Sequence, residues 1–252
     1  MDATRFRRLD GAPPLIFGHR GVRGDAPENT MAAFELAAEA GADGIELDVR
    51  LCRSGEVVVC HDPTLTRATG GRDTRAVADL DAGELARADL GDGQPVPLLE
   101  EVLRWARARP LCVNVEIKRD VPDRPRVVRE TASVLRRELA ASATVMASSF
   151  DPWMLAYFGW LLPAALRGSL FSSESSLEKL QTSGWVAALI GARAVHPERK
   201  LVLPDRCRKW KKRGNLVNVW TVNDVEEARG LAAMGVDAII TDVPNVMVRA
   251  LR

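Results

Sequence analysis

The sequence predicts a single α/β domain folded as a (β/α)8 TIM barrel. Its 252 residues match the usual length of this fold and are enough for one large hydrophobic core. Short apolar runs recur along the chain, and most precede a segment with helical periodicity, which is typical of parallel strands wrapped by helices. Eight such runs favour a closed barrel over an open sheet: 15–19, 44–49, 112–118, 144–149, 165–171, 192–196, 217–222 and 237–241.

Segments with helical periodicity lie between these runs and complete the repeating pattern. The clearest are 30–40, 98–109, 126–140 and 225–234. No linker or low-complexity tract divides the chain, so composition gives no sign of a second domain. We therefore expect one domain over residues 1–252, with the barrel core at about 15–245.

A β-hairpin and a small insertion are expected after the second strand. Strand-like runs flank Ser54-Gly55, a short turn signal. With these two turn residues, Asp48 lies opposite His61, whereas a slip of one residue turns His61 to the other face. The glycine-rich stretch 62–97 is the insertion. It either covers a functional site or is a passive surface segment.

Composition and charge exclude several function classes. Thirty-five basic and 34 acidic residues leave a net charge of +1, so we predict no nucleic-acid partner. No motif predicts a protein partner. The amino terminus has mixed charge and no apolar signal-peptide core, so we expect a cytoplasmic protein. The four cysteines follow no metal-binding spacing and are expected to be reduced and mostly buried: Cys52, Cys60, Cys112 and Cys207.

Polar residues at the ends of the predicted strands indicate a functional site there. Glu46 and Asp48 alternate along one strand, so both point to the same face and present oxygen ligands suited to a divalent cation. Active sites of β/α barrels gather where the strands end. The residues at or just beyond a predicted strand end are His19, Glu46, Asp48, Glu116, Lys118, Ser149, Trp220 and Asp242.

An ordered set of motifs resembles the glycerophosphodiester phosphodiesterase family, and it extends from about residue 15 to 245. In one departure, Cys52-Arg53-Ser54-Gly55 stands where the family often has Thr-x-Asp-Gly. The motifs are Gly18-His19-Arg20-Gly21, Pro27-Glu28-Asn29-Thr30, Gly41-Ala42-Asp43 with Glu46 and Asp48, His61-Asp62, Glu116-Ile117-Lys118, Trp220-Thr221-Val222-Asn223 and Thr241-Asp242-Val243-Pro244.

The resemblance implies a metal-dependent phosphoric diester hydrolase of lipid and glycerol metabolism. Its reaction would convert glycerophosphodiesters to glycerol 3-phosphate and an alcohol. The residue types suit this chemistry, since carboxylates hold a hard cation and histidines act as general acid and base near neutral pH. The nucleophile, either water or the substrate's 2-hydroxyl, stays open, as does which histidine is the acid. The implied roles are catalysis for His19 and His61, binding of one Mg²⁺ or Ca²⁺ for Glu46, Asp48 and Glu116, phosphate contacts for Arg20 and Lys118, and pocket lining for Trp220.

Some neighbouring residues have simpler structural interpretations. His196 belongs to no motif of comparable specificity and is interpreted as structural. Cys60 alternates away from His61 and is expected to pack as a buried thiol. Glu28, Asn29 and Thr30 suit the start of a helix, where capping side chains and acids are favourable.

Two segments suggest a possible peripheral membrane contact. Residues 153–166 carry no charge but are too short to span a bilayer. We expect exposure in this segment because helical periodicity buries only one face, formed by Leu155, Phe158 and Leu162. The segment Arg206–Arg213 contains six basic residues and is either a solvated helix face or a site for anionic headgroups. The side chains expected on the exposed face are Trp153, Met154, Tyr157, Trp160 and Leu161.

Two alternative functions remain open. One is hydrolysis of lysophospholipids at a membrane surface, a lysophospholipase D-type activity, which contact through Trp153–Leu162 and Arg206–Arg213 would favour. The other is a non-catalytic barrel that binds a phosphorylated ligand. The presence of two histidines argues against the second alternative, because a binding protein needs no groups for proton transfer.

Overall fold

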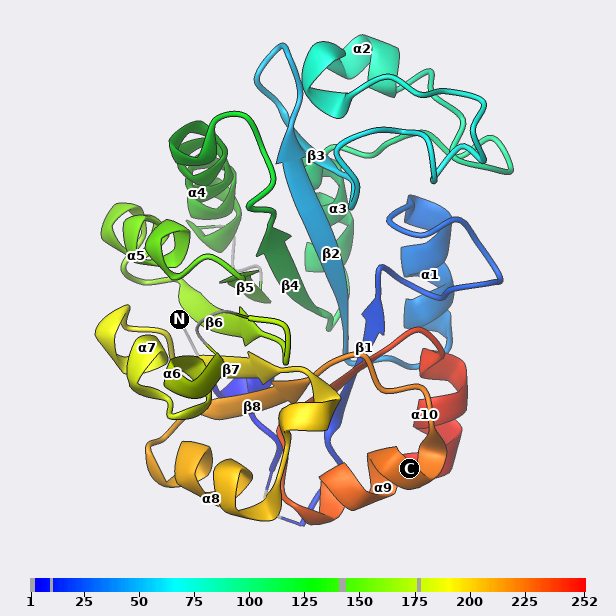
Figure 1. The fold of residues 1–252 in the computed structure, drawn as a ribbon. Helices are drawn as coiled ribbons and strands as arrows, with labels where there is room; N and C mark the ends of the chain where they lie inside the picture. The colour runs from blue at the N-terminus through cyan, green and yellow to red at the C-terminus, as the bar shows by residue number, and fades with distance from the viewer. Residues whose placement is uncertain (1–2, 10, 141–143, 176–177) are drawn as a thin grey trace.

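The computed structural model describes residues 3–9, 11–140, 144–175 and 178–252. Among these residues, eight parallel strands close into a barrel surrounded by helices, which confirms the predicted TIM barrel (Figure 1). The barrel closes because β1 pairs with both β2 and β9. Its strands are β1 (Leu15–His19), β2 (Gly44–Leu51), β4 (Cys112–Ile117), β5 (Thr144–Ser149), β6 (Leu166–Phe171), β7 (Ala194–Pro197), β8 (Leu216–Val219) and β9 (Ala238–Thr241).

Helices follow the strands as the periodicity predicts. Thr30 caps the first of them, since its hydroxyl accepts a hydrogen bond from the Ala33 backbone N–H at 3.3 Å. The helices are α1 (Met31–Glu39), α2 (Ala82–Leu85), α3 (Leu99–Arg107), α4 (Arg124–Ala140), α5 (Pro152–Leu161), α6 (Glu178–Thr182), α7 (Trp185–Leu189), α8 (Pro204–Lys212), α9 (Val225–Ala233) and α10 (Pro244–Leu251), with short 3-10 turns at Ala3–Phe6, Val77–Asp79 and Arg199–Leu201.

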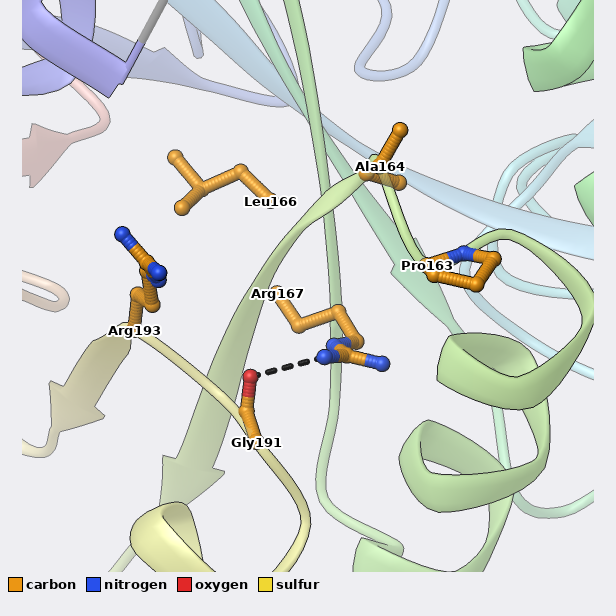
Figure 2. A pocket seen from close by; sticks show the side chains of 7 residues that line it. Pro163, Ala164, Leu166, Arg167, Gly191 and Arg193 are labelled. Atoms are coloured by element: carbon orange, nitrogen blue, oxygen red, sulfur yellow. Dashed lines mark hydrogen bonds between the residues drawn. The ribbon is translucent and has the colours of Figure 1, made fainter. Parts of the chain in front are cut away.

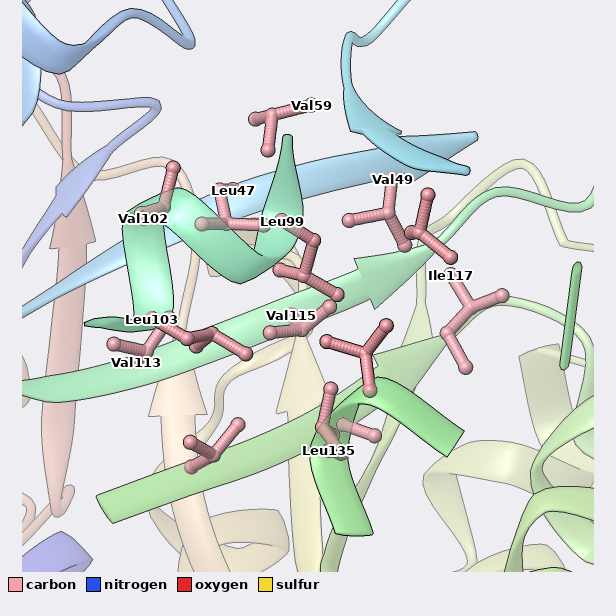
Figure 3. Close-up of a cluster of buried hydrophobic side chains, with 14 of the residues drawn as sticks. Leu47, Val49, Val59, Leu99, Val102, Leu103, Val113, Val115, Ile117 and Leu135 are labelled. Carbon is pink, nitrogen blue, oxygen red and sulfur yellow. The ribbon is translucent and has the colours of Figure 1, made fainter. Parts of the chain in front are cut away.

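Alternation along the strands separates the core from the site. In β2, Leu47 and Val49 point outward and are fully buried against the helices, whereas Glu46 and Asp48 point into the barrel. Figure 3 shows the outward side chains of β2 and β4 packed against α3. Burial of each such Leu or Val side chain stabilises the fold by roughly 1.5–3 kcal/mol.

Apolar side chains fill the barrel at the end where the strands begin. This cluster takes Phe6 from the amino-terminal turn and Phe17 from β1, whose rings stack with centroids 6.1 Å apart. Met146, Leu216 and Ile240 contribute from β5, β8 and β9. Because this end is filled, the polar inward-facing residues are displayed at the opposite end, where the strands finish. We call that opposite end the mouth of the barrel.

The predicted hairpin exists, but its predicted register is wrong by one residue. Strand β3 (Val57–Val59) pairs antiparallel with β2, with Val49 opposite Val59. Asp48 therefore faces Cys60, whose N–H donates to the Asp48 carbonyl at 2.9 Å, and not His61. The loop between the two strands has three residues, Arg53 to Gly55, and not the two that were predicted. Gly55 closes this longer loop with a φ of +103°, a conformation that favours glycine.

The stretch 62–97 forms a small folded unit beside the mouth (Figure 1). Apolar side chains from the stretch, among them Leu65, Val77 and Leu85, pack on Val58 and Cys60 of the hairpin as a cluster separate from the barrel core. Arg67 extends from this unit to the carboxylates of Asp62 and Glu28, at 2.5 and 2.8 Å. The insertion thus contacts the site.

Helix α5 matches the exposure that its sequence predicts only in part, since Tyr157 and Leu161, expected to be exposed, are partly buried against the outer core. Leu155, Phe158 and Leu162 are buried as expected, and Trp153 and Trp160 are exposed. Met154 is buried, contrary to expectation, because it lies on the edge of the helix that packs into the outer core. In the part of the chain that the structure describes, no helix has the length and apolar character needed to cross a bilayer.

Candidate active site

The mouth of the barrel holds a cavity of about 280 Å³. Seven of the eight predicted site residues line it, and the eighth, Asp48, is completely buried beside them. Ser149 is not part of the site, because its hydroxyl donates to the Ile117 carbonyl at 2.8 Å. The lining residues are His19, Arg20, Glu46, His61, Asn114, Glu116, Lys118, Phe150, Leu170, Trp220, Thr221 and Ile240.

Three buried carboxylates meet at the base of this cavity. Glu46, Asp48 and Glu116 each offer an oxygen, and these oxygens lie within 4.8 Å of one another. The register of β2 and β4 produces the cluster, since Asp48 pairs with Glu116. Burial, together with the negative charges of Asp48 and Glu116, raises the pKa of Glu46 well above its usual value.

This carboxylate cluster fits a hard divalent cation. Among the described residues, the buried Oε2 atom of Glu46 has no hydrogen-bond partner. Such an oxygen is costly to bury unless something binds it. Oxygen donors from several carboxylates are the ligands that Mg²⁺ and Ca²⁺ prefer. Glu46, Asp48 and Glu116 can therefore hold a metal ion.

Asp48 is fixed by partners on three sides. The Asn29 amide donates to its Oδ2 at 3.0 Å, Arg20 Nε lies 3.0 Å from the same oxygen, and Lys118 Nζ lies 3.3 Å from Oδ1. Burial alone would raise the pKa of Asp48, but the cations of Arg20 and Lys118 hold it below its usual value. Asp48 therefore stays ionised.

Asn29 contributes to the site as well as to the start of α1. It adopts a φ of +59°, which Asn tolerates better than most residues, and this conformation turns its amide toward Asp48. Sequence analysis predicted only a structural role at the helix start. The preference of Asn for positive φ was the available signal, but the contact itself depends on the position of β2.

His19 is oriented by a carboxylate from the other end of the chain. Its Nδ1 lies 2.6 Å from Asp242 Oδ1, and Asn223 Nδ2 donates to the second oxygen of Asp242 at 2.7 Å. Burial opposes ionisation of Asp242, yet the hydrogen bond from His19 lowers the pKa of this carboxyl to about 2. With Nδ1 bound to Asp242, Nε2 is directed toward Glu46, 3.9 Å away.

His61 is held in a matching way despite the shifted hairpin register. Strand β3 ends at Val59, so the chain is free to turn before His61. Its Nδ1 lies 2.6 Å from Asp62 Oδ1. The buried Arg50 guanidinium donates to the His61 carbonyl from Nε at 2.9 Å and from Nη2 at 2.6 Å. Arg50 also binds Asp120 beyond β4, at 2.6 Å between Nη2 and Oδ2, so it joins the hairpin to the barrel.

Two cations and an aromatic wall complete the cavity. Arg20 pairs with Glu28 at 3.0 Å, and Lys118 pairs with Glu116 at 2.9 Å. Trp220 is locked by its indole N–H, which donates to the His196 carbonyl at 2.7 Å. Its ring meets Phe150 edge to face, with centroids 5.4 Å apart. The site therefore combines a metal-binding base, fixed positive charge and an apolar wall.

A sequence model of the glycerophosphoryl diester phosphodiesterase family matches residues 19–246. The chain belongs to this family. It is thus a phosphoric diester hydrolase, as the ordered motifs led us to expect.

Named relatives cover almost the entire chain. The glycerophosphodiester phosphodiesterase of Caldanaerobacter subterraneus is 32% identical over 94% of this chain and 98% of its own length. That of Bacillus altitudinis is 32% identical over 93% and 96%. The structure of an Oleispira antarctica phosphodiesterase in complex with the product sn-glycerol-3-phosphate is 25% identical, with a TM-score of 0.84 and coverage of 94% and 96%.

Two residues near the site of this phosphodiesterase are structural, as predicted. His196 is fully buried, its Nε2 lies 3.0 Å from Asn218 Nδ2, and burial lowers its pKa to about 3. Cys60 is buried as well, which raises the pKa of its thiol to about 12. A neutral imidazole and a protonated thiol of this kind supply no acid, base or nucleophile near neutral pH.

A larger outer cavity of about 630 Å³ adjoins the first. Both are lined by His61, Glu116, Lys118, Phe150 and Trp220. The outer cavity continues over Ser172, Glu174 and Glu198. The phosphodiesterase therefore has an inner compartment beside the carboxylates and a wider one leading to solvent.

Proposed function

We propose that the enzyme hydrolyses glycerophosphodiesters to glycerol 3-phosphate and an alcohol, with one Mg²⁺ or Ca²⁺ and with His19 and His61 as general acid and base. The observation that supports this best is the single cavity at which three clustered carboxylates and two carboxylate-bound histidines meet. The related phosphodiesterase that binds sn-glycerol-3-phosphate supports the same product.

Charge neutralisation is the first requirement of the reaction, because a phosphodiester is an anion that repels nucleophiles. A cation held by Glu46, Asp48 and Glu116 would withdraw charge from the phosphate oxygens. Arg20 and Lys118 line the same cavity and add fixed positive charge. Their own carboxylate partners hold both side chains in place before substrate arrives.

Proton transfer is the second requirement. The Nδ1 atoms of His19 and His61 are bound by Asp242 and Asp62, so the Nε2 atoms are the ones available to a substrate. One imidazole takes the proton of the attacking hydroxyl, and the other, when protonated, gives a proton to the departing alkoxide. The scheme holds whether the hydroxyl belongs to water or to the glycerol moiety.

The two compartments suggest how the substrate lies. We place the glycerol phosphate in the inner cavity of about 280 Å³, against Phe150, Leu170 and Trp220. The departing alcohol then occupies the outer cavity of about 630 Å³. Because the outer compartment is larger, we expect the enzyme to accept a range of leaving alcohols. Changes in the glycerol moiety, which lies in the smaller inner cavity, should be accepted less readily.

The test is release of glycerol 3-phosphate from a panel of glycerophosphodiesters with choline, ethanolamine or glycerol head groups. Each is assayed with Mg²⁺, with Ca²⁺ and with EDTA. We expect release that depends on the metal and is restored when metal is added back after EDTA. Full activity in EDTA would contradict the role of the carboxylates, and inactivity with every substrate would favour the non-catalytic phosphate-binding barrel.

A second candidate substrate is a lysophospholipid, cleaved in the manner of a lysophospholipase D. The observation in its favour is that α5, with the exposed Trp153, begins directly after Phe150 of the outer cavity. Lysophosphatidylcholine is therefore included in the panel. A kcat/KM above that of glycerophosphocholine would make the lysophospholipid the preferred substrate.

A further inference from the structure

An aromatic stripe runs along the outside of α5. Trp153 is 80% exposed and Trp160 is 75% exposed, seven residues apart and hence on the same side of the helix. Tyr157 lies between them and stacks on Trp160, with ring centroids 6.0 Å apart. The helix carries no charged side chain. Large exposed aromatic groups of this kind usually mark a surface that meets a partner.

A second apolar group lies on α7, on the other side of β6 (Figure 1). Trp185 is 59% exposed and Leu189 is 80% exposed. Arg167 of β6 extends between α5 and the loop after α7. A Cβ atom at Gly159 of α5 would lie 1.2 Å from Arg167 Nη1, and one at Gly191 would lie 2.9 Å from Nη2. The absence of side chains at these two glycines makes room for the guanidinium.

The Arg167 side chain lines a pocket of about 220 Å³ between the starts of β6 and β7 (Figure 2). Its Nη2 donates to the Gly191 carbonyl at 2.8 Å, while its buried Nε has no hydrogen-bond partner among the described residues. Arg193 lines the same pocket, and neither arginine forms an ion pair within the described part of the chain. Two unpaired guanidinium groups in one pocket suit a phosphate-sized anion.

Further unpaired cations stand on α8, which packs beside α7. Arg213 lies over the Trp185 ring, 5.3 Å from its centroid. Lys209 and Lys212 are exposed and, as far as the structure describes the chain, have no carboxylate partner. Lys211, by contrast, pairs with Asp237. Cys207 and Trp210 point inward and are fully buried, so the cations cover the outer face of the helix.

Apart from Trp153, which stands at the start of α5 near the mouth, these groups lie toward the opposite end of the barrel. Helices α5, α7 and α8 finish there, and β6 and β7 begin there. The surface alternates positive charge with aromatic and aliphatic groups, without a carboxylate among the pocket-lining residues. We call this surface the lower rim, and it consists of Trp160, Arg167, Trp185, Leu189, Arg193, Lys209, Lys212 and Arg213.

We propose that the lower rim docks the enzyme on a membrane that contains anionic phospholipid, with a lipid phosphate in the pocket of Arg167 and Arg193. Tryptophan side chains favour the boundary between headgroups and acyl chains, because the ring is apolar and the indole N–H is polar. Unpaired lysines and arginines nearby are attracted to the negative surface. The interleaving of both kinds of side chain distinguishes this surface from a merely solvated basic helix.

Vesicle flotation tests the proposal with the full-length protein. One set of vesicles contains phosphatidylcholine alone, and the other contains phosphatidylcholine with phosphatidylglycerol. We expect binding to the second set only. Replacing two cations, in an Arg193→Gln/Lys212→Gln variant, should weaken this binding by about 30-fold. A Trp160→Ser/Trp185→Ser variant should also lose binding, which separates insertion of the aromatic groups from attraction by charge.

The matched control is Arg87→Gln, which removes an exposed cation two residues after α2 of the insertion. Figure 1 shows α2 far from α7 and α8. It should bind vesicles like the wild type. Turnover of a water-soluble glycerophosphodiester checks that each variant is folded. None of the replaced residues lines the catalytic cavity, so this turnover should not change.

Three outcomes would overturn the proposal. One is no binding to either set of vesicles. Another is binding of inorganic phosphate that depends on Arg193 without binding to vesicles, which would assign the pocket to a free anion. The third is self-association that Trp160→Ser/Trp185→Ser abolishes while vesicles are not bound, which would make the lower rim a contact between two copies of the chain.

Discussion

The two ends of the barrel differ in whether their arginine and lysine side chains have carboxylate partners. At the mouth of the barrel, Arg20, Arg50 and Lys118 are each held by carboxylates within about 3 Å. At the lower rim, Arg167 and Arg193 have no such partner among the described residues. At the mouth the pairing follows from burial, because a charge removed from water needs a compensating partner. At the lower rim Arg193 is exposed and is stabilised by solvent, whereas Arg167 is only partly exposed and keeps a buried Nε without a hydrogen-bond partner among the described residues.

Pairing therefore has a different meaning at each end. The ion pairs of the mouth position groups for chemistry on a small anion and leave little net field outside. The unpaired cations of the rim create a local field that attracts an extended negative surface, although the whole chain has a net charge of only +1. Substitutions at each end should thus change different properties.

The largest effect is expected from the histidines of the mouth. His19→Ala and His61→Ala should each lower kcat by about 100- to 10,000-fold, because a proton-transfer group is lost. Metal binding, measured by calorimetry, should persist in both variants since the carboxylates are unchanged. His196→Gln is the matched control. This histidine lies outside the cavity, so the variant should keep the kcat of the wild type. Unchanged kcat in either alanine variant would rule out the assigned role.

Arg50 is expected to have the next largest effect, through positioning. Arg50→Gln removes the fork that holds the His61 carbonyl and Asp120, so kcat should fall by roughly 10- to 100-fold, a typical cost of losing such support. Arg50→Lys should recover only part of the loss because lysine lacks the planar fork. Arg53→Gln, on the same hairpin but exposed, serves as the control. Equal kcat in all three variants would contradict this positioning role.

Between the two ends, the buried His196 should make the fold sensitive to acid. Its pKa is lowered from 6.5 to about 3 in the folded protein. Between these values the unfolded chain binds the proton and the native protein does not, so the free energy of unfolding falls as the pH falls. Midway between the two pKa values the loss should be roughly 2 kcal/mol.

Urea unfolding near neutral pH and at that midpoint measures this loss. His196→Gln should show a smaller decrease between the two conditions, whatever its stability near neutral pH. An identical decrease in the wild type and the variant would assign the acid sensitivity to other groups.

The smallest effect on turnover is expected at the lower rim. Arg193→Gln/Lys212→Gln should leave kcat and KM for a water-soluble substrate within about twofold, because surface substitutions away from the site have little effect. Added salt should weaken vesicle binding of the wild type strongly, since it screens exposed charge, and should affect the buried pairs of the mouth less. Equal salt sensitivity of binding and turnover would remove the distinction between the two ends.

The sequence predicts the barrel and its catalytic end better than the relations between side chains. Alternation along β2 was sufficient to place Glu46 and Asp48 on one face, because strand geometry has a fixed period. The approach of Glu116 to these two residues depends on the register of β2 and β4. The hairpin register could not be predicted, since it depends on whether Gly55 closes a two- or a three-residue loop. A register shift of one residue turns each side chain of the strand to the opposite face of the sheet.

Contacts between segments that are distant in the sequence could not be predicted either. The bonds from Asn29 to Asp48 and from Arg50 to His61 join elements whose approach is set by the whole barrel. The pocket of Arg167 depends on two glycines, Gly159 and Gly191, from different segments. The basic run of α8 was visible, but its position beside the aromatic groups of α7 was not.

The placement of the rim and the mouth at opposite ends determines which molecules the docked enzyme can reach. An enzyme resting on its lower rim would turn its active site outward, so lipids embedded in the same leaflet would remain beneath it. Dissolved diesters arriving from the water would enter freely. Anchoring would then concentrate turnover in the thin aqueous layer next to the membrane, where water-soluble fragments of degraded phospholipids first appear.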